Sequence, residues 1–538
     1  MKNIEIPYAE TRGRRYRFFE ILPGLISWIA LAFPFFLALI SAKLTVIFVI
    51  AYLLLWFTKA VGLNIRSMQG FRTISRHGKL PWQSMIDDLN AEILPTESKT
   101  SKLIPAWHQK NLARYRSNSE SLDPREILHA IIVAAYNESV EVIEPTIKAV
   151  LESDFDMKKV ILVFAYEGRD GAQSEKAVLH LRDKYGAMFG HCITAKHPQT
   201  DGEVKGKGGN ITFAARVLEK YLAKQKIKPE QVIVTTLDSD NRPHPKYLAA
   251  LTYMYAVTPD PLHVSYQPVT MYTNNIWDVP APMRVIASGS SFWNMVLSMR
   301  PHIIRNFSAH AQGMAALIDT DYWSVRTIVE DGHQFWRTYF RYDGNHEVYP
   351  VYLPIYQDAV LSSNYRKTIR AQFIQLRRWA WGSSDIAYVA DRGFFTKNKV
   401  PKLDLILKFS RLLEGHVAWA TAPFILFFAA FIPAWISPDD YAANQLPLVA
   451  SRIQTVALVG IFITLFLSFK TLPPKPKRHK AHRVLFMIAQ WVLLPVTTIV
   501  FNATAALVSQ TRLMFGKYLD NFDVTDKAVI KDDKKRVM

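Results

Sequence analysis

The chain has 538 residues, of which 49% are hydrophobic and 21% are charged, and its formal net charge is +19. This length allows two or more domains, and the mixture of apolar and charged residues predicts membrane segments joined to a soluble domain. The single cysteine, Cys192, excludes an intrachain disulfide and a zinc site built from cysteines. The positive charge fits an anionic membrane surface or a phosphorylated substrate. No groove-reading motif points to nucleic acid.

Five apolar segments predict helices that associate with a membrane. Residues 21–40 are uncharged and long enough to cross a bilayer, and residues 44–58 form a tight helical hairpin with them. Residues 417–436 and 453–469 predict a third and a fourth span. The run 484–516 is too long for one ordinary span. It is either a tilted helix with an interfacial piece or a pair of half-helices that re-enter.

Basic residues set the expected orientation. They gather before the first span, after the second, and between the fourth and fifth, whereas the loop after the third carries Asp439 and Asp440. The positive-inside rule then places the N-terminus and the soluble domain in the cytoplasm, against membrane lipids, as in a bacterial inner membrane. The expected parts are residues 1–65, the tail and hairpin; 66–400, the cytoplasmic domain ending in an interfacial helix; 401–516, the C-terminal helices; and 517–538, a cytoplasmic tail.

Within the soluble domain, predicted strands and helices alternate. Continuous apolar strands are predicted at residues 127–139, where the strand ends in a polar turn, and at 158–168 and 231–240, with helices at 140–153 and 175–186 between them. This pattern predicts a parallel α/β sheet covered on both faces. Ligands bind at the carboxyl ends of the strands in such sheets. The polar residues at those ends are Asn137, Glu138, Glu167, Asp238 and Asp240.

The stretch "TTLDSDNRPHP" (235–245) places Asp238 and Asp240 one residue apart at the end of a strand. Two carboxylates so spaced can share a divalent cation, because Mg²⁺ and Mn²⁺ prefer oxygen ligands and often bind through one or two carboxylates and substrate phosphates. A simple turn is the alternative, since Asp-Ser-Asp-Asn is good turn chemistry. The position in the sheet favours the cation.

Two further stretches carry candidate residues. "KGKGGN" (205–210) precedes a predicted helix, and its glycines and Lys207 suit a phosphate, although a flexible basic loop is the alternative. "TIVEDGHQFWR" (327–337) offers Glu330 and Asp331, of which one could be a general base. Asp331 could instead cap the helix that follows. Asp358, in "PIYQDAV", is a rival base.

"AQFIQLRRWAWG" (371–382) combines arginines with tryptophans. Arginine binds phosphate in a fork geometry, and tryptophan offers a flat face for a sugar ring. An amphipathic helix at the membrane interface is the alternative reading, and both can hold together.

The order Asp-x-Asp after a strand, then Glu-Asp, then Gln-x-x-Arg-Trp, between membrane spans, resembles the processive glycosyltransferase family 2 synthases, which include cellulose, chitin and hyaluronan synthases. Gln375, Arg378 and Trp379 form the most specific part of the match. "FDVTDK" (522–527) resembles the gating-loop motif of cellulose synthases, with Phe522, Val524, Thr525 and Lys527 as its residues. Because that loop is cytoplasmic, the resemblance favours re-entry of residues 484–516.

The resemblance implies a GT-A, Rossmann-like α/β catalytic domain inserted between transmembrane helices. Asp238 and Asp240 would hold the nucleotide sugar and Mg²⁺ or Mn²⁺, with Asp240 preferred as metal ligand, and Asp331, beside Glu330, would be the base. Arg378 would hold the diphosphate, and Trp379, with Gln375, the acceptor sugar. Other donor contacts would be Asn137, Glu138, Lys207 and Asn210, with Glu167 or Asp170 in place of an acidic pair that the family has after its second strand.

The implied reaction is inverting transfer from a nucleotide sugar, a UDP-sugar first of all, to a growing saccharide with coupled export. The alternative is transfer of one sugar to a lipid-linked acceptor such as a polyprenyl phosphate. A glycosidase also uses two carboxylates but needs no basic phosphate site. A membrane transporter or scaffold with a degraded domain is disfavoured because the expected residues are all present. The need for a partner subunit stays open.

Overall fold

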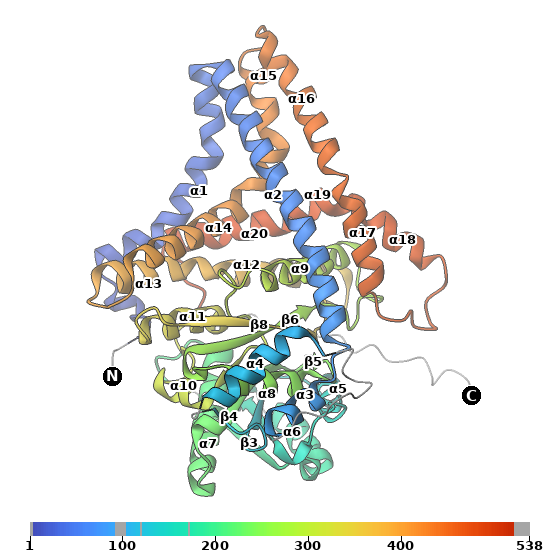
Figure 1. Cartoon of the computed structure of the whole chain (residues 1–538). Helices are drawn as coiled ribbons and strands as arrows, with labels where there is room; N and C mark the ends of the chain where they lie inside the picture. Colours follow the sequence, from blue (N-terminus) through green and yellow to red (C-terminus); the bar gives the residue numbers. More distant parts are fainter. Residues whose placement is uncertain (1–3, 92–103, 119–120, 171–172, 199, 521–538) are drawn as a thin grey trace.

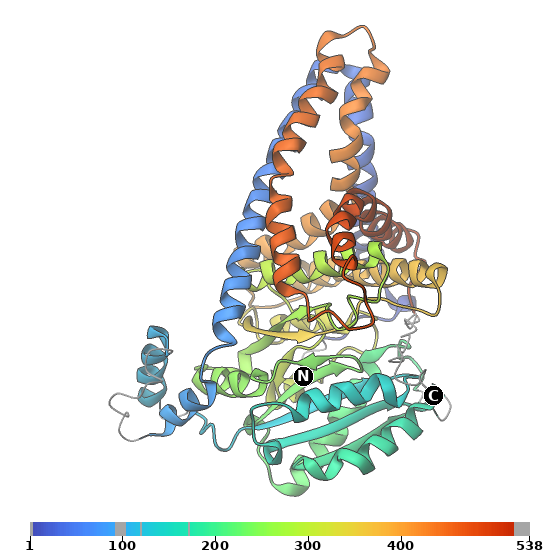
Figure 2. The ribbon, with the colours of Figure 1, turned by 90° about the vertical axis from the view of Figure 1, so that its right-hand side faces the viewer.

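The computed structural model of the chain describes residues 4–91, 104–118, 121–170, 173–198 and 200–520. Long helices stand at one end of the molecule, and a β-sheet with its covering helices forms the other end (Figures 1 and 2). Three helices lie crosswise between the two ends: α9 (Ala281–Ser298), α12 (Tyr365–Ala380) and α20 (Thr504–Met514).

Five helical stretches form where the sequence predicted apolar segments, and each is long and apolar enough to cross a membrane. They are Arg14–Ile40, Ala42–His77, Lys402–Ile436, Tyr441–Thr471 and Arg483–Met514. The first two are α1 (Arg14–Ile40) and α2 (Ala42–His77), joined in the predicted tight hairpin at Ser41. Helix α2 continues without a break beyond residue 65 as far as the sheet domain (Figure 1).

The upright helices pack through small and branched side chains and leave large apolar side chains outside. The third stretch is α14 (Lys402–Phe428) with α15 (Ile432–Ile436), and the fourth is α16 (Tyr441–Ala457) with α17 (Gly460–Thr471). Their shared core consists of Ala38, Val49, Leu53, Ile425, Ala429, Ala430, Ile432, Leu446 and Ala450. Outside it, Phe36 and Ile40 are 65% and 78% exposed. Apolar faces of this kind suit lipid rather than water.

The fifth stretch is one interrupted helix, not two half-helices. It runs through α18 (Arg483–Ala489), α19 (Leu494–Val496), a π-helix (Thr497–Ala503) and α20, with 3₁₀ geometry before α19. Figure 1 shows it crosswise at the foot of the upright helices. Re-entry through half-helices is therefore wrong for this segment. After α20, Tyr518 and Leu519 pack against Ile328 and Val329, which precede Glu330.

The sheet has eight strands in the order β3-β2-β1-β4-β7-β6-β8-β5. Its first half is parallel and consists of β1 (Leu128–Ala135), β2 (Val160–Glu167), β3 (His191–His197) and β4 (Val232–Asp238). The strands predicted at 127–139, 158–168 and 231–240 are confirmed as β1, β2 and β4, and the first ends at Ala135, before its polar turn. This half is the parallel α/β arrangement that the sequence predicts.

The second half of the sheet is mixed, so the prediction of a wholly parallel sheet is wrong. It contains β5 (Arg242–Pro243), β6 (Val264–Met271), β7 (Ala311–Gly313) and β8 (Glu347–Tyr356). Strand β7 runs antiparallel to both β4 and β6, while β6 and β8 are parallel. The short β7 has no apolar run that a sequence pattern could detect, and β6 and β8 are interrupted by prolines and polar residues.

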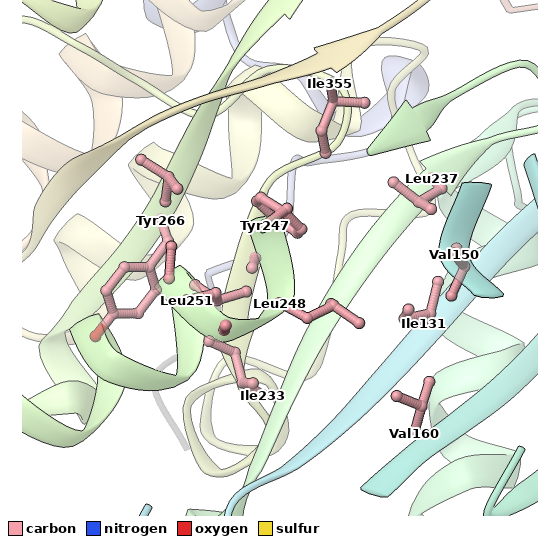
Figure 3. Close-up of a cluster of buried hydrophobic side chains, with 14 of the residues drawn as sticks. Ile131, Val150, Val160, Ile233, Leu237, Tyr247, Leu248, Leu251, Tyr266 and Ile355 are labelled. Atoms are coloured by element: carbon pink, nitrogen blue, oxygen red, sulfur yellow. The ribbon is translucent and has the colours of Figure 1, made fainter. Parts of the chain in front are cut away.

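Alternate residues of the central strands enter two separate cores, as the two-residue period of a strand requires. Ile131 and Val133 pack on one face with α5 (Val140–Leu151), α6 (Gln173–Tyr185) and α8 (Tyr247–Val257). Figure 3 shows part of this core. Ala130 and Ile132 pack on the other face with α7 (Lys207–Gln225). With both faces covered, the exposed carboxyl ends of the strands are where a ligand can reach this half of the sheet.

The docking of α2 on α9 depends on Gly70. A Cβ atom at Gly70 would lie 2.8 Å from the carbonyl oxygen of Met295 and 3.0 Å from its Cβ. We expect Gly70→Ala to lower the stability of the protein by about 1–3 kcal/mol, because the two backbones would have to separate. Thermal unfolding in lipid nanodiscs measures this effect.

Gly289→Ala, in the middle of α9, is the matched control. Nothing lies within 4 Å of a Cβ there, so alanine should be neutral or stabilise the helix by up to about 1 kcal/mol. Equal unfolding midpoints for the two variants would contradict the close α2–α9 contact.

Candidate active site

The turns after β1 and β4 are bound to each other. Asp238, the last residue of β4, pairs in register with Ala134 of β1. Beyond these ends, the Glu138 carboxylate accepts a hydrogen bond from Ser239 Oγ at 2.9 Å. Asn137 has a positive φ of 60°, and its backbone N–H donates to Ser174 Oγ at 2.6 Å. The predicted residues Asn137, Glu138 and Asp238 thus come together at one edge of the sheet.

Asp238 is anchored by a lysine and a serine. Lys207 Nζ lies 2.7 Å from Asp238 Oδ1, and Ser308 Oγ donates to Oδ2 at 2.5 Å. Burial alone would lower the pKa of Lys207, but the charges of Asp238 and Glu330 outweigh it and the pKa is raised. Lys207 is therefore a charged residue at the first position of α7, only 11% exposed, and the flexible-loop alternative is wrong.

Gly208 allows α7 to begin at this position. A Cβ on Gly208 would lie 2.3 Å from the carbonyl oxygen of Ser324 and 3.2 Å from Glu330 Cβ. The close approach at Gly208 is thus to the protein's own backbone. It brings Lys207 against the segment that leads into α11 (Glu330–Arg341).

Glu330 and Asp331 are the first two residues of α11. The N-cap is Val329, so the helix-capping alternative for Asp331 is wrong. Burial, followed by the charge of Asp331, raises the pKa of Glu330 to about 8. Burial also raises the pKa of Asp331, although Lys207 and the N–H of Gly332, 2.7 Å from Oδ1, oppose this rise. At neutral pH, Glu330 favours its protonated form, whereas Lys207 and the N–H of Gly332 favour the charged form of Asp331.

Asp240 lies beside the rival base. Its Oδ2 accepts a hydrogen bond from the backbone N–H of Asp358 at 3.2 Å, and its carbonyl accepts one from Asn274 at 3.0 Å. The N–H of Asn241 donates to the carbonyl of Asp238, so the turn predicted as an alternative is present as well. The hydrogen bond of this turn joins backbone atoms, so it does not engage the carboxylates, and the turn holds them at the end of β4.

Tyr272, which follows β6, links these carboxylates to the end of α12. Burial and the charges of Asp238, Asp240 and Asp331 raise its pKa, while the charge of Arg378 lowers it. Its ring centroid is 5.8 Å from that of Trp379. Sequence reasoning missed Tyr272 and Ser308, because neither belongs to a local motif. Arg378 and Trp379 thereby join the same site.

Helix α12 is one of the three crosswise helices, and its end packs against another of them, α20. Its following residue, Trp381, forms an apolar cluster with Ile328, Val329 and Leu513 of α20. Gln375 accepts a hydrogen bond from Gln372 at 3.2 Å. The interfacial-helix interpretation of this segment is therefore compatible with a place in the site.

Two predicted donor residues are tied to neighbouring elements. The Glu167 carboxylate lies 3.1 Å from Arg169 Nε and 3.3 Å from His197 Nδ1. Asn210 is 3% exposed and donates to the carbonyl of Ala165 at 3.1 Å, so it holds the end of β2. Beside them is a cavity of about 380 Å³ lined by Gly168, Arg169, Lys196, His197 and Pro198. Its wall is basic.

The carboxylates of the site fit a divalent cation that a substrate helps to bind. Within the described part of the chain, no three or more His, Cys, Asp or Glu side chains converge as a complete metal site. Asp238 and Asp240 offer oxygen ligands, and the diphosphate of a substrate would complete the set. With Glu330 protonated, the carboxylates of Asp238, Asp240 and Asp331 still outnumber the two positive groups, Lys207 and Arg378.

The predicted gate residues Phe522, Val524, Thr525 and Lys527 lie outside the described residues. The segment before them does not: Tyr518 and Leu519 pack on the cluster of Ile328, Val329, Trp381 and Leu513. The chain therefore leaves α20 beside the segment that carries Glu330.

A search with models of protein families finds no match for the sequence, and neither does a search of curated proteins. Among solved structures, the chain is similar to a mannosyltransferase from Pyrobaculum calidifontis in complex with GDP-Man and Mn²⁺, at 13% identity and a TM-score of 0.38, over 85% of this chain and 100% of that one. It is also similar to S. aureus TarS, at 13% identity and a TM-score of 0.35, over 63% of this chain and 54% of that one. It is similar as well to TarS 1–349 in complex with UDP-GlcNAc, at 12% identity and a TM-score of 0.36, over 73% of this chain and 93% of that one. These similarities are remote. What can be said of the function of this chain therefore rests on the residues of its site.

The raised pKa of Glu330 makes stability depend on pH. The folded protein keeps a proton that the unfolded chain releases, so the free energy of unfolding falls as pH rises from about 4.5 to about 8. We expect Glu330→Gln to remove roughly 1–2 kcal/mol of this fall between pH 6 and 8. Unfolding measured across that pH range tests it. The exposed Glu152→Gln is the control, and parallel pH curves for Glu330→Gln and the unsubstituted protein would contradict the buried, protonated Glu330.

Proposed function

We propose that the protein is a membrane-embedded, inverting glycosyltransferase. It moves a sugar from a nucleoside diphosphate sugar onto a growing polysaccharide. One observation carries this proposal: charged side chains from the end of β4, the turn after it, α11 and α12 lie around Tyr272, next to a tryptophan, and a lysine of α7 pairs with the first of them. They are Lys207, Asp238, Asp240, Asp331, Arg378 and Trp379.

The donor's diphosphate matches the positive groups of the site. Arg378 would bind it in fork geometry, and Lys207 holds Asp238 in place beside it. Mg²⁺ or Mn²⁺ at Asp238 and Asp240 would neutralise charge on the departing diphosphate. The nucleoside of the donor would bind at the turn of Asn137 and Glu138 and in the basic cavity at Arg169. We expect this nucleoside to be uridine, so that the donor is a UDP-sugar.

The reaction follows from the charges at α11. Asp331 takes the proton of the acceptor hydroxyl as the hydroxyl oxygen forms a bond to the anomeric carbon. The bond from that carbon to the diphosphate oxygen breaks, and the nucleoside diphosphate leaves with the electron pair. Glu330 is protonated at neutral pH, so it adds no second negative charge beside the base. A single displacement of this kind inverts the anomeric centre.

The acceptor would rest on Trp379, whose ring lies beside Tyr272 and below the apolar helices. Basic residues at the membrane-proximal loops support a cytoplasmic catalytic domain under the positive-inside rule. A polymer held at Trp379 would then pass outward between the helices as it grows. The second candidate, transfer of one sugar to a polyprenyl phosphate acceptor, uses the same donor site but leaves no growing sugar chain for Trp379 to hold.

Replacing the carboxylates one at a time tests their roles. We expect Asp240→Asn and Asp331→Asn each to lower the rate of transfer by about 10²–10⁴-fold while the protein stays folded in the membrane. Initial rates with purified protein in lipid measure this loss. Asp358→Asn is the matched comparison, since Asp358 lies next to Asp240. If Asp331→Asn keeps near-normal turnover and Asp358→Asn does not, the base is Asp358.

The products decide between the two candidate functions. With Mg²⁺ or Mn²⁺ and a panel of radiolabelled nucleotide sugars, we expect one donor to yield a long, glycosidase-sensitive product that EDTA abolishes. Sizing of the product by gel filtration is the measurement. A single labelled sugar on extracted lipid would favour the lipid-acceptor enzyme. No transfer from any donor of the panel would contradict the proposed function.

A further inference from the structure

The N-terminal segment Ile4–Tyr8, here called the strap, is built into the domain that carries the site. Ile4 and Ile6 are 7% and 6% exposed, and Ile6 packs with the aromatic cluster of α11. The backbone carbonyl of Ile4 accepts a hydrogen bond from Tyr388 Oη at 2.6 Å, and that of Glu5 accepts one from Arg392 at 3.0 Å. A segment held by its backbone in this way is part of the folded domain rather than a tail.

Glu5 connects the strap to the helix of the candidate base. One carboxylate oxygen lies 2.7 Å from Arg337 Nη1, and the other accepts a hydrogen bond from Ser324 Oγ at 2.5 Å. Arg337 is on α11, two turns after Glu330, and is only 1% exposed. Arg337 also donates to the carbonyl of Thr320 at 2.7 Å. Glu5 thus bridges α11 and the loop that precedes it.

The second partner of Glu5 reaches the lysine of the site. The carbonyl of Ser324 is the group that a Cβ on Gly208 would meet, at 2.3 Å, so Ser324 lies directly against the first turn of α7. Lys207 begins that turn. Two other strap contacts hold the same loop: Arg326 donates to the carbonyl of Ile6 at 2.9 Å and stacks on Tyr8 at 3.6 Å.

We propose that Glu5 is a positioning residue that fixes α11 and its preceding loop, and through them the spacing of Asp331 and Lys207. The kinetic part of this proposal rests on the proposed transferase function. Glu5 does not touch the site itself. It acts because Arg337 is buried, and a buried guanidinium without its carboxylate moves or draws in water. A displacement of α11 of about 1 Å would be enough to cost catalysis up to about 10²-fold.

The test compares Glu5→Ala and Glu5→Gln with Glu10→Ala, an exposed glutamate of the same N-terminal region. We expect Glu5→Ala to lower kcat by about 10- to 100-fold while the donor KM changes by less than about threefold. Glu5→Gln keeps oxygen and nitrogen atoms for both hydrogen bonds but loses the charge, so its kcat should lie between. Glu10→Ala should behave like the unsubstituted protein.

Hydrogen exchange gives a readout that needs no activity. In Glu5→Ala, amides of residues 324–341 should exchange at least about tenfold faster, while those of β1 and β2 stay unchanged. If α11 exchanges as in the unsubstituted protein, or if kcat is unchanged although α11 is loosened, the proposal is wrong. If Glu5→Ala does not fold, the same comparisons are made with Glu5→Gln. Absence of transfer in the unsubstituted protein contradicts the proposed function alone, since the exchange result still decides whether Glu5 holds α11.

Discussion

The site depends on the ion pair between Lys207, which is 11% exposed, and the half-buried Asp238. It joins the first turn of α7 to the end of β4 and places one positive charge among carboxylates that burial would otherwise drive towards protonation. An unpaired charge at this depth would be costly, so neither partner can be lost without disturbing the other. Lys207 opposes the rise in the pKa of both acids of α11, and Glu330 nevertheless remains protonated near neutral pH.

The membrane helices and the site share structural elements. Arg17 of α1 donates to the carbonyl of Leu513 at 2.8 Å, and Glu20 of α1 accepts a hydrogen bond from Tyr518 at 2.8 Å. Leu513 in turn packs on Val329, which precedes Glu330. The first membrane helix, the crosswise layer and α11 are therefore in continuous contact. A polymer or lipid that displaced α20 would therefore also displace the segment that carries Glu330 and Asp331.

The fold could be predicted from the sequence where the pattern is local. Strands β1, β2 and β4 are unbroken apolar runs, and they were predicted together with the helices that follow β1 and β2. Strand β7 has three residues, and β6 contains a proline, so their pairing is decided by distant parts of the chain. For residues 484–516 a single tilted helix with an interfacial piece was one of two alternatives, and the sequence could not decide between them because length and apolarity do not fix the direction of a helix.

The candidate site was predictable for residues in compact motifs, namely Asp238, Asp240, Asp331, Arg378 and Trp379. Tyr272 and Ser308 stand in ordinary-looking sequence and reach the site only through the sheet. Glu5 was missed for the same reason, since its partners are more than three hundred residues away. Asn210 was predicted as a donor contact from the family resemblance, and its hydrogen bond to Ala165 shows a structural part that a motif does not reveal.

The central claim is that the carboxylates at the end of β4 and the basic groups around them hold a nucleoside diphosphate with a divalent cation. Pulsed EPR of Mn²⁺ with the protein in lipid nanodiscs, in the presence of UDP or GDP, tests this claim most directly. The account predicts phosphorus coupling from the diphosphate to the bound Mn²⁺, and loss of that signal in Asp240→Asn. Mn²⁺ bound without phosphorus coupling, or coupling that Asp240→Asn leaves unchanged, would contradict it.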